Sequence, residues 1–260
     1  MKHSFFLTSR PNHVPLWKTV ICYLLVYCAV IGIIWRCLAV SSIQLNFQFV
    51  HQYRTRIWNG FLMTIEISAA SLLLSLIIGV PVALGQQSRV LPVRALCSLY
   101  VTLIRGTPLI VQVYFFFYVL GTAWGIENRE VAGILILSIF AGAYIAEIVR
   151  GSLLSLDKGQ LEAALAVGFT HTQTVRYIIV PQLVSRTLPA LTGQVASIIK
   201  DSSLLSVIAV IELTQTMREI SATNYNFFGC FFLLGGLYLV LTLPLMLVSS
   251  CLEKRLAFEQ

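Results

Sequence analysis

Six long runs of apolar residues follow one another along this chain, separated by segments that carry most of its charged side chains. They cover about residues 19–36, 60–84, 95–120, 131–149, 187–211 and 227–250. Each run is close to the ~20 residues that a helix needs to cross the hydrocarbon core of a bilayer, and none alternates as a barrel strand does. Lipid offers no hydrogen bonds to backbone groups, so the runs are predicted to be helices. The pattern indicates an all-α polytopic membrane protein.

The composition excludes a soluble domain. Hydrophobic residues make up 57% of the chain and charged residues only 11%, with a mean hydropathy of +0.83. So few polar side chains could not cover the surface of a soluble globule. The net charge of +7 is not arranged as a basic stripe interleaved with aromatic residues, so nucleic-acid binding is not expected. The six cysteines form no CxxC pair, so neither a disulfide framework nor a metal site is expected.

Lysine and arginine residues indicate how the spans are oriented. With the N-terminus in the cytoplasm, eleven of them fall inside and five outside, which favours cytoplasmic N- and C-termini. The first run could instead be a cleaved signal peptide, because small side chains follow it at Ala39–Ser42. The segment that ends at Lys18 fits an uncleaved anchor better. The five basic residues placed outside are Arg36, Arg54, Arg56, Arg129 and Arg218.

The residues of common membrane enzymes are missing from the sequence. The only aspartates are Asp157 and Asp201, and none of the four histidines falls within an apolar run. HExxH and the Walker pattern GxxxxGK[ST] are both absent, so any ATP used must be bound by another chain. No catalytic, cofactor-binding or metal-binding residues are therefore assigned, and the chain is not expected to be an enzyme.

Two runs carry local signals about helix shape. Arg105-Gly106-Thr107-Pro108 interrupts the third run, and Pro108 both lacks an N–H and restrains Thr107. A break is predicted there, between a shallow helix from about Leu91 to Arg105 and a spanning helix through Val119. In the second run, small residues recur at steps of three and four, which predicts a face that packs closely on other helices. These residues are Gly60, Thr64, Ser68, Ser71, Ser75 and Gly79.

A polar insert, Glu162 to Pro181, follows the fourth run where a plain membrane protein needs only a short loop. Its first part, Lys158 to Val167, has a helix-forming composition. That helix is predicted to end at Gly168, because glycine is the residue best suited to a left-handed C-terminal cap.

The insert also contains a second helix signal. Thr170-x-x-Gln173 is a capping-box pattern that predicts a helix start, and the helix is predicted to end near Val180 because Pro181 cannot continue it. Two short capped helices with a sharp corner would form a rigid protrusion at the inner face of the membrane. Such a protrusion favours contact with a partner, and the alternative is an amphipathic loop that rests on lipid headgroups.

The spacing of residues in the insert is specific. It runs Glu162-Ala163-Ala164, three residues, Gly168, nine residues, Ile178, one residue, a hydrophobic residue and Pro181. This pattern resembles the signature loop of the membrane subunits of bacterial ATP-binding-cassette (ABC) importers, with Val180 where the family usually has leucine. Three further segments resemble the polar amino acid permeases, the histidine, glutamine, glutamate and arginine uptake group. They are RGTPLIVQVYFFFY at 105–118, AYIAEIVRGSL at 143–153 and KDSSLLSVIAVIEL at 200–213.

The resemblance covers about residues 57–256 and implies a permease transmembrane domain with the five-helix core of type I ABC importers. Residues 1–56 would add an N-terminal cytoplasmic segment, one extra transmembrane helix and an external loop. In the family, the coupling loop, here 157–181, docks on a cytoplasmic ATPase dimer. The resemblance assigns docking to Glu162, Ala163, Ala164 and Gly168.

The resemblance also implies the partners. ATP and Mg²⁺ would be bound by the ATPase and no cofactor by this chain. A second permease subunit, identical or related, would complete the pore, and an extracytoplasmic binding protein would deliver the amino acid. The assembly would lie in the bacterial cytoplasmic (inner) membrane.

Charged residues inside the runs are candidates for the substrate pathway, because a charge near the bilayer centre costs on the order of 3 kcal/mol unless it faces a cavity or a partner. Glu147 could hold the α-ammonium group of an amino acid. Its alternative role is a helical i, i+3 ion pair with Arg150. Lys200 and Asp201 could line the pathway or form their own ion pair at a helix break. Ser202 and Ser203 would supply further hydrogen bonds there, and Thr107 and Gln112 are weaker candidates beside the first break.

The leading hypothesis is therefore the transmembrane permease subunit of an ATP-driven importer for polar amino acids. A self-sufficient secondary transporter or channel would explain broken spans and buried charges equally well, but it would not explain the insert. A membrane scaffold would show no dependence on solute.

Overall fold

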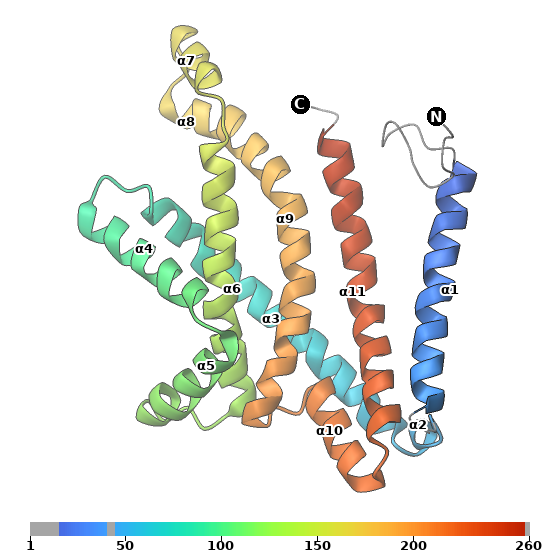
Figure 1. Ribbon diagram of the computed structural model, residues 1–260. Helices are drawn as coiled ribbons and strands as arrows, with labels where there is room; N and C mark the ends of the chain where they lie inside the picture. The colour runs from blue at the N-terminus through green and yellow to red at the C-terminus, as the bar shows by residue number, and fades with distance from the viewer. Residues whose placement is uncertain (1–15, 41–44, 258–260) are drawn as a thin grey trace. The chain divides into compact units, whose positions relative to one another are not determined.

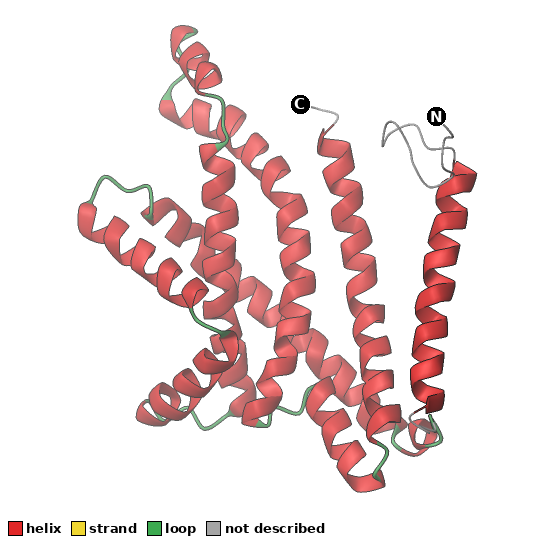
Figure 2. Ribbon diagram, viewed as in Figure 1, coloured by secondary structure: helices red, strands yellow, loops and turns green. Residues whose placement is uncertain are grey.

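The computed structural model describes residues 16–40 and 45–257, and the elements in these ranges are helices (Figures 1 and 2). This confirms the predicted all-α fold. The chain divides into two units, Met1–Asn46 and Phe47–Gln260. The first unit contains α1 (Leu16–Val40), and the second contains the remaining described helices and both regions considered below as functional.

Four of the described helices are long and apolar enough to cross a membrane, namely α1, α3 (Arg54–Gly85), α6 (Arg129–Leu154) and α11 (Phe227–Ala257). Two further stretches of suitable length and composition are bent. In the first, α4 (Leu91–Gly106) meets α5 (Leu109–Tyr114) and the π-helical η1 (Phe115–Gly121) at 111°. In the second, the helix over His171–Ile208 meets α10 (Leu213–Asn224) at 50°. With each bent pair taken as one span, the described part of the chain has the six spans predicted.

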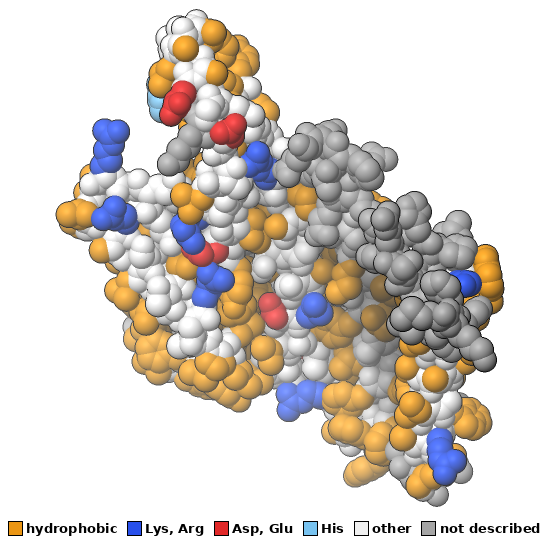
Figure 3. Space-filling view, turned by 45° about the horizontal axis from the view of Figure 1, so that its top comes forward, with side chains coloured by type: hydrophobic (Ala, Val, Ile, Leu, Met, Phe, Trp, Pro, Cys, Tyr) orange, Lys and Arg blue, Asp and Glu red, His pale blue; other side chains and the backbone are white. Residues whose placement is uncertain are grey.

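The other elements are short or lie between the spans. They are α2 (Phe49–Gln52), α7 (Lys158–Ala166), α8 (His171–Thr174), the π-helical η2 (Val175–Ile179), α9 (Val180–Asp201) and the 3₁₀-helical η3 (Ser202–Ile208). Helices α7 and α8 stand at one end of α6 and α9, which lie side by side (Figure 1). Hydrophobic side chains cover much of the face shown in Figure 3, and the charged side chains form small groups.

Close packing of α3 on α6 forms the centre of the second unit. The predicted small-residue face of α3 is buried along its whole length, from Gly60 to Gly79. A Cβ on Gly79 would lie 2.7 Å from Gly142 O of α6, so the two backbones approach too closely for any side chain at this point. The prediction that this face packs against helices is confirmed.

The predicted break at Thr107 and Pro108 is present, because both residues adopt extended backbone between α4 and α5. A break of this kind exposes the last carbonyls of α4, which lack partners within the helix. Gln112, which is buried, satisfies two of the acceptors there. Its Nε2 lies 2.7 Å from Ile104 O and 3.1 Å from Thr107 O.

The predicted helix end near Val180 is wrong. The chain stays helical from α8 through η2 into α9, and Pro181 occupies the first turn of α9. Proline lacks an N–H and its ring clashes with the carbonyl four residues earlier in an α-helix. The π-helical turn of η2, which lies directly before Pro181, is the kind of irregularity that lets a helix pass such a residue.

Candidate functional site

The insert forms an elbow, defined here as residues 157–181. Its first arm, α7, begins after Asp157, whose Oδ1 accepts a hydrogen bond from Gly159 N at 2.9 Å. The arm ends at Gly168, which has a left-handed backbone with φ of +84°. There Gly168 N donates to Leu165 O and Phe169 N donates to Ala164 O, both at 3.0 Å. These two bonds satisfy the last carbonyls of the arm and set the corner, as the sequence predicted.

The second arm begins at the predicted capping box. Thr170 N donates to Gln173 Oε1 at 2.8 Å, and Gln173 N donates back to Thr170 Oγ1 at 3.4 Å. The two reciprocal bonds satisfy backbone donors that a helix start leaves without partners. Both arms of the elbow are therefore capped by their own side chains.

Two contacts join the helices at the base of the elbow. Gln182 Nε2 of α9 donates to Gln160 Oε1 of α7 at 2.5 Å, which joins the two arms. Arg186 Nη1 of α9 donates to Ser155 Oγ at 2.9 Å and also to the Ser155 carbonyl, directly after the end of α6. The first bond ties α7 to α9, and the second ties α9 to the end of α6 at the base of the elbow.

The elbow presents apolar side chains where a solvated loop would present polar ones. Val167 is 72% exposed, and Leu165 and Tyr177 are also exposed. Of the residues assigned to docking, Glu162, Ala163 and Gly168 are exposed, whereas Ala164 is buried. Between the arms lies an open hollow of about 390 Å³. It is lined by Gln160, Ala163, Ala164, Val167, Phe169, Tyr177, Ile178, Pro181 and Gln182.

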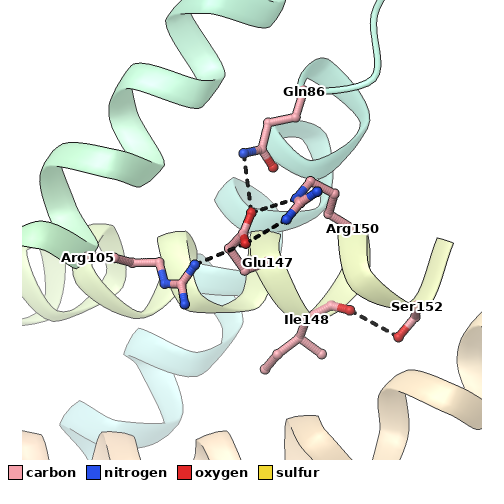
Figure 4. A network of polar contacts seen from close by, with 6 residues as sticks. All are labelled: Gln86, Arg105, Glu147, Ile148, Arg150 and Ser152. Carbon is pink, nitrogen blue, oxygen red and sulfur yellow. Dashed lines mark hydrogen bonds and ion pairs between the residues drawn. The ribbon is translucent and has the colours of Figure 1, made fainter. Parts of the chain in front are cut away.

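A second group of polar residues, the Glu147 cluster, consists of Gln86, Arg105, Glu147 and Arg150 (Figure 4). Arg150 donates to both carboxylate oxygens of Glu147, from Nε at 2.7 Å and from Nη2 at 2.9 Å. Arg105 Nη1 of α4 lies 3.0 Å from Glu147 Oε2. Gln86 Nε2, at the end of α3, donates to Glu147 Oε1 at 3.4 Å. The helical pair with Arg150, given above as the alternative role of Glu147, is thus present.

The other pathway candidates lie apart from the Glu147 cluster in their contacts. Thr107 Oγ1 donates to Leu103 O at 2.8 Å and lies 2.8 Å from Gln112 Nε2, so both residues serve the break in the third run. Lys200 is exposed and Asp201 half-buried at the end of α9, where η3 begins.

The ion pair between Lys200 and Asp201, one of the two roles considered for these residues, is not formed within 4.0 Å in the part of the chain that the structure describes. Consecutive residues of a helix point in different directions, which explains why the two side chains do not pair. Ser202 Oγ instead donates to Ile199 O at 2.8 Å, and Ser203 is half-buried.

Sequence reasoning missed Glu212, which is fully buried. Its carboxylate caps α10 by accepting hydrogen bonds from Thr214 N at 2.7 Å and Gln215 N at 2.8 Å. Tyr238 OH of α11 donates to it at 3.0 Å. The helix that follows, α10, was not predicted either, and the available signal was an acidic residue two and three positions before Thr214 and Gln215, the spacing of a helix N-cap. Across residues 16–40 and 45–257, no group of three His, Cys, Asp or Glu side chains is placed to hold a metal ion.

Comparison with known proteins bears on the elbow and the fold together. The family described as "Binding-protein-dependent transport system inner membrane component" matches residues 71–258, which include the whole elbow. The chain belongs to this family. Members are multi-pass components of the inner membrane, and this permease has the helices to match.

Individual relatives agree with the family. The permease is 37% identical over 199 residues to the glutamine transport system permease protein GlnP of Escherichia coli, with 76% of this chain and 91% of that protein covered. It is 35% identical over 198 residues to the L-cystine transport system permease protein TcyB of Bacillus subtilis, with 76% and 85% covered.

Solved structures extend the likeness to the fold. The crystal structure of an amino acid ABC transporter with histidines matches with a TM-score of 0.75 and 31% identity, covering 82% of this chain and 100% of that one. An inward-facing form of the MetNI methionine ABC transporter shares the fold at a TM-score of 0.60 and 18% identity, covering 80% and 99%. The five-helix type I importer core predicted from the sequence is confirmed.

Proposed function

We propose that this chain is the transmembrane permease subunit of an ATP-driven importer for polar amino acids. The observation that carries the proposal is the elbow, a capped corner with exposed apolar side chains that connects two spans, α6 and α9. Exposed apolar surface marks a contact with a protein or a membrane, and the resemblance of this segment to the docking loop of ABC importers favours a protein. The relatives named above, permeases of glutamine and cystine transport systems, support the amino acid class.

The proposed contact is a cytoplasmic ATP-binding-cassette ATPase dimer, which would bind ATP and Mg²⁺. Glu162, Ala163, Ala164 and Gly168 would form the docking corner, and the hollow between the arms would accept part of the ATPase surface. Because the elbow connects α6 to α9 along the chain, and the Arg186–Ser155 hydrogen bond joins these two helices at its base, movement of the ATPase would be passed to both spans. The elbow would then lie in the cytoplasm, as would both termini.

The remaining partners follow from the same proposal. A second permease subunit, identical or related, would complete the pore, and an extracytoplasmic binding protein would deliver the amino acid. Residues 1–56 would supply the extra span and an external loop, and residues 57–256 the permease domain. The proposed substrate pathway passes the two breaks in the spans, because irregular backbone at membrane depth is found where it lines a cavity. Its candidate residues are Glu147, Thr107, Gln112, Lys200, Asp201 and Ser203.

Reconstitution tests the proposal. The permease is assembled in liposomes with the ATPase and the binding protein of its own system, and ATP hydrolysis and uptake are measured with a panel of polar amino acids. ATP-dependent uptake of one or more of them is expected. Uptake driven by an ion gradient without nucleotide would favour a secondary transporter, and ATP turnover that no amino acid changes would favour a scaffold.

A further inference from the structure

The Glu147 cluster holds two guanidinium groups and one carboxylate, so it carries a surplus positive charge within the spans. The carboxylate of Glu147 is surrounded by four nitrogen atoms, two from Arg150 and one each from Arg105 and Gln86. An ammonium group could therefore bind Glu147 only by displacing one of these donors. The four contacts are unequal, and the difference identifies which donor would leave.

Arg150 is the tightly held donor. It makes two hydrogen bonds to Glu147 from the same helix, and bidentate pairs of this kind are the stronger charged contacts. Arg105 comes from a different helix and offers a single nitrogen to Glu147 at 3.0 Å. Its guanidinium otherwise lies over the ring of Tyr144, 5.3 Å from the centroid. The Arg105 side chain is 41% exposed, so most of its five N–H donors remain available.

Arg105 is also not needed to satisfy the end of α4. The carbonyls there are bound by other side chains, since Gln112 Nε2 reaches Ile104 O and Thr107 Oγ1 donates to Leu103 O. On the other side of the cluster, Gln86 Oε1 is a buried acceptor with no hydrogen-bond partner among the residues that the structure describes. The cluster thus offers spare donors at Arg105 and a spare acceptor beside Glu147.

From these contacts we infer that the α-ammonium and α-carboxylate groups of a free amino acid replace the Arg105–Glu147 ion pair. The carboxylate binds the guanidinium of Arg105, and the ammonium binds Glu147 and Gln86 Oε1. One internal ion pair is exchanged for two ion pairs with the ligand. A ligand with only the ammonium group would leave Arg105 without an anionic partner, and a ligand with only the carboxylate would leave Glu147 with Arg150 and Gln86 alone, so each would lose one of the two charged contacts. The site would therefore recognise the α-ammonium and α-carboxylate groups that all free amino acids share, and not the side chain.

This inference rests on the proposed function, which it deepens by naming the groups that recognise the substrate. It is tested on the permease–ATPase complex in lipid nanodiscs, without the binding protein, so that the selectivity of that protein does not enter. Radiolabelled L-glutamine, L-glutamate, L-histidine and L-arginine serve as probes. The α-carboxamide and the N-acetyl derivative of each serve as competitors. Arg105→Gln and Glu147→Gln are compared with Arg94→Gln, which changes an exposed arginine on the same helix α4.

Arg105→Gln is expected to weaken binding of at least one probe by about 10- to 100-fold, the loss of a charge-assisted contact, and Arg94→Gln to leave it unchanged. The carboxamide, which lacks the carboxylate, should bind wild type and Arg105→Gln within about twofold of each other. The N-acetyl derivative should likewise not lose affinity in Glu147→Gln. Size-exclusion profiles establish that Arg105→Gln and Glu147→Gln still assemble with the ATPase.

Three results would overturn the inference. The first is equal weakening of acid and carboxamide by Arg105→Gln, which would mean a structural role for the arginine. The second is unchanged binding in Arg105→Gln together with loss of a co-purified anionic lipid, which would assign the arginine to a lipid phosphate. The third is a wild-type complex that binds none of the four probes. Failure of the proposed function is separate, because it would appear as ATP turnover without any response to amino acids in the full system.

Discussion

Gly168 allows the docking proposal to be tested by backbone conformation alone. A Cβ at this position would meet no heavy atom within 4 Å, so substitution causes no clash. The cost comes instead from the φ of +84°, which an ordinary L-residue adopts at roughly 1–2 kcal/mol. If the ATPase binds the corner as observed, that strain must be overcome on docking. Gly168→Ala should then weaken ATPase binding by about 5- to 30-fold, with a smaller loss for Gly168→Asn because asparagine tolerates this conformation.

The assay titrates fluorescently labelled ATPase onto the permease in nanodiscs and measures coupled uptake in liposomes alongside. Gly159→Ala is the matched control, because it changes a glycine of α7 with no left-handed backbone and only ordinary contacts, 3.4 Å to Asp157 Oδ1. Equal affinities for wild type, Gly168→Ala and Gly168→Asn would refute the reasoning, as would a loss in Gly159→Ala as large as that in Gly168→Ala.

Other features of the fold give predictions of stability. Gly79→Ala should lower the free energy of unfolding by about 1–3 kcal/mol, because its Cβ would lie 2.7 Å from Gly142 O. Gly151→Ala is the control, since a Cβ there meets open space, and thermal unfolding in nanodiscs compares the two variants. Glu212→Ala removes the cap of α10 and should cost about 0.5–2 kcal/mol in the same assay, and an unchanged midpoint would contradict the capping role. Gln112→Leu removes the donor to the carbonyls of Ile104 and Thr107, at a cost of about 1–3 kcal/mol, and should speed amide hydrogen exchange at the α4–α5 break. Unaltered exchange there would count against that role.

The features that the sequence predicted well are those that depend on a few neighbouring residues. The hydrogen bonds of the left-handed cap at Gly168 and of the capping box at Thr170 each join residues at most five positions apart, so local patterns suffice to predict them. The break before Pro108 is local in the same sense. The helix through Pro181 was mispredicted because the same residue type can end a helix or follow a π-helical turn. Which of the two occurs depends on the packing of α9, which the local pattern does not contain.

The Glu147 cluster shows what local patterns cannot supply. Arg150 could be recognised as a partner because it lies three residues along the same helix. Arg105 and Gln86 come from the ends of two other helices, and they reach Glu147 only because α3 and α4 both pack on α6. Glu212 differs, because its capping bonds to Thr214 and Gln215 are local and only its contact with Tyr238 of α11 is not.

Helix α6 carries Glu147 and leads directly into the elbow, so it links the Glu147 cluster to the docking region. Ser155, at the base of the elbow, lies eight residues after Glu147, or about 12 Å along the helix. Displacement of the elbow would therefore move Glu147 with it. Arg150 moves too, because it lies on the same helix, and its two hydrogen bonds to Glu147 are preserved. Arg105 belongs instead to α4, and Gln86 lies at the end of α3. Movement driven by the ATPase would therefore act on the contacts that reach Glu147 from other helices, those of Arg105 and Gln86, and the first of these is the contact that we infer the amino acid to replace.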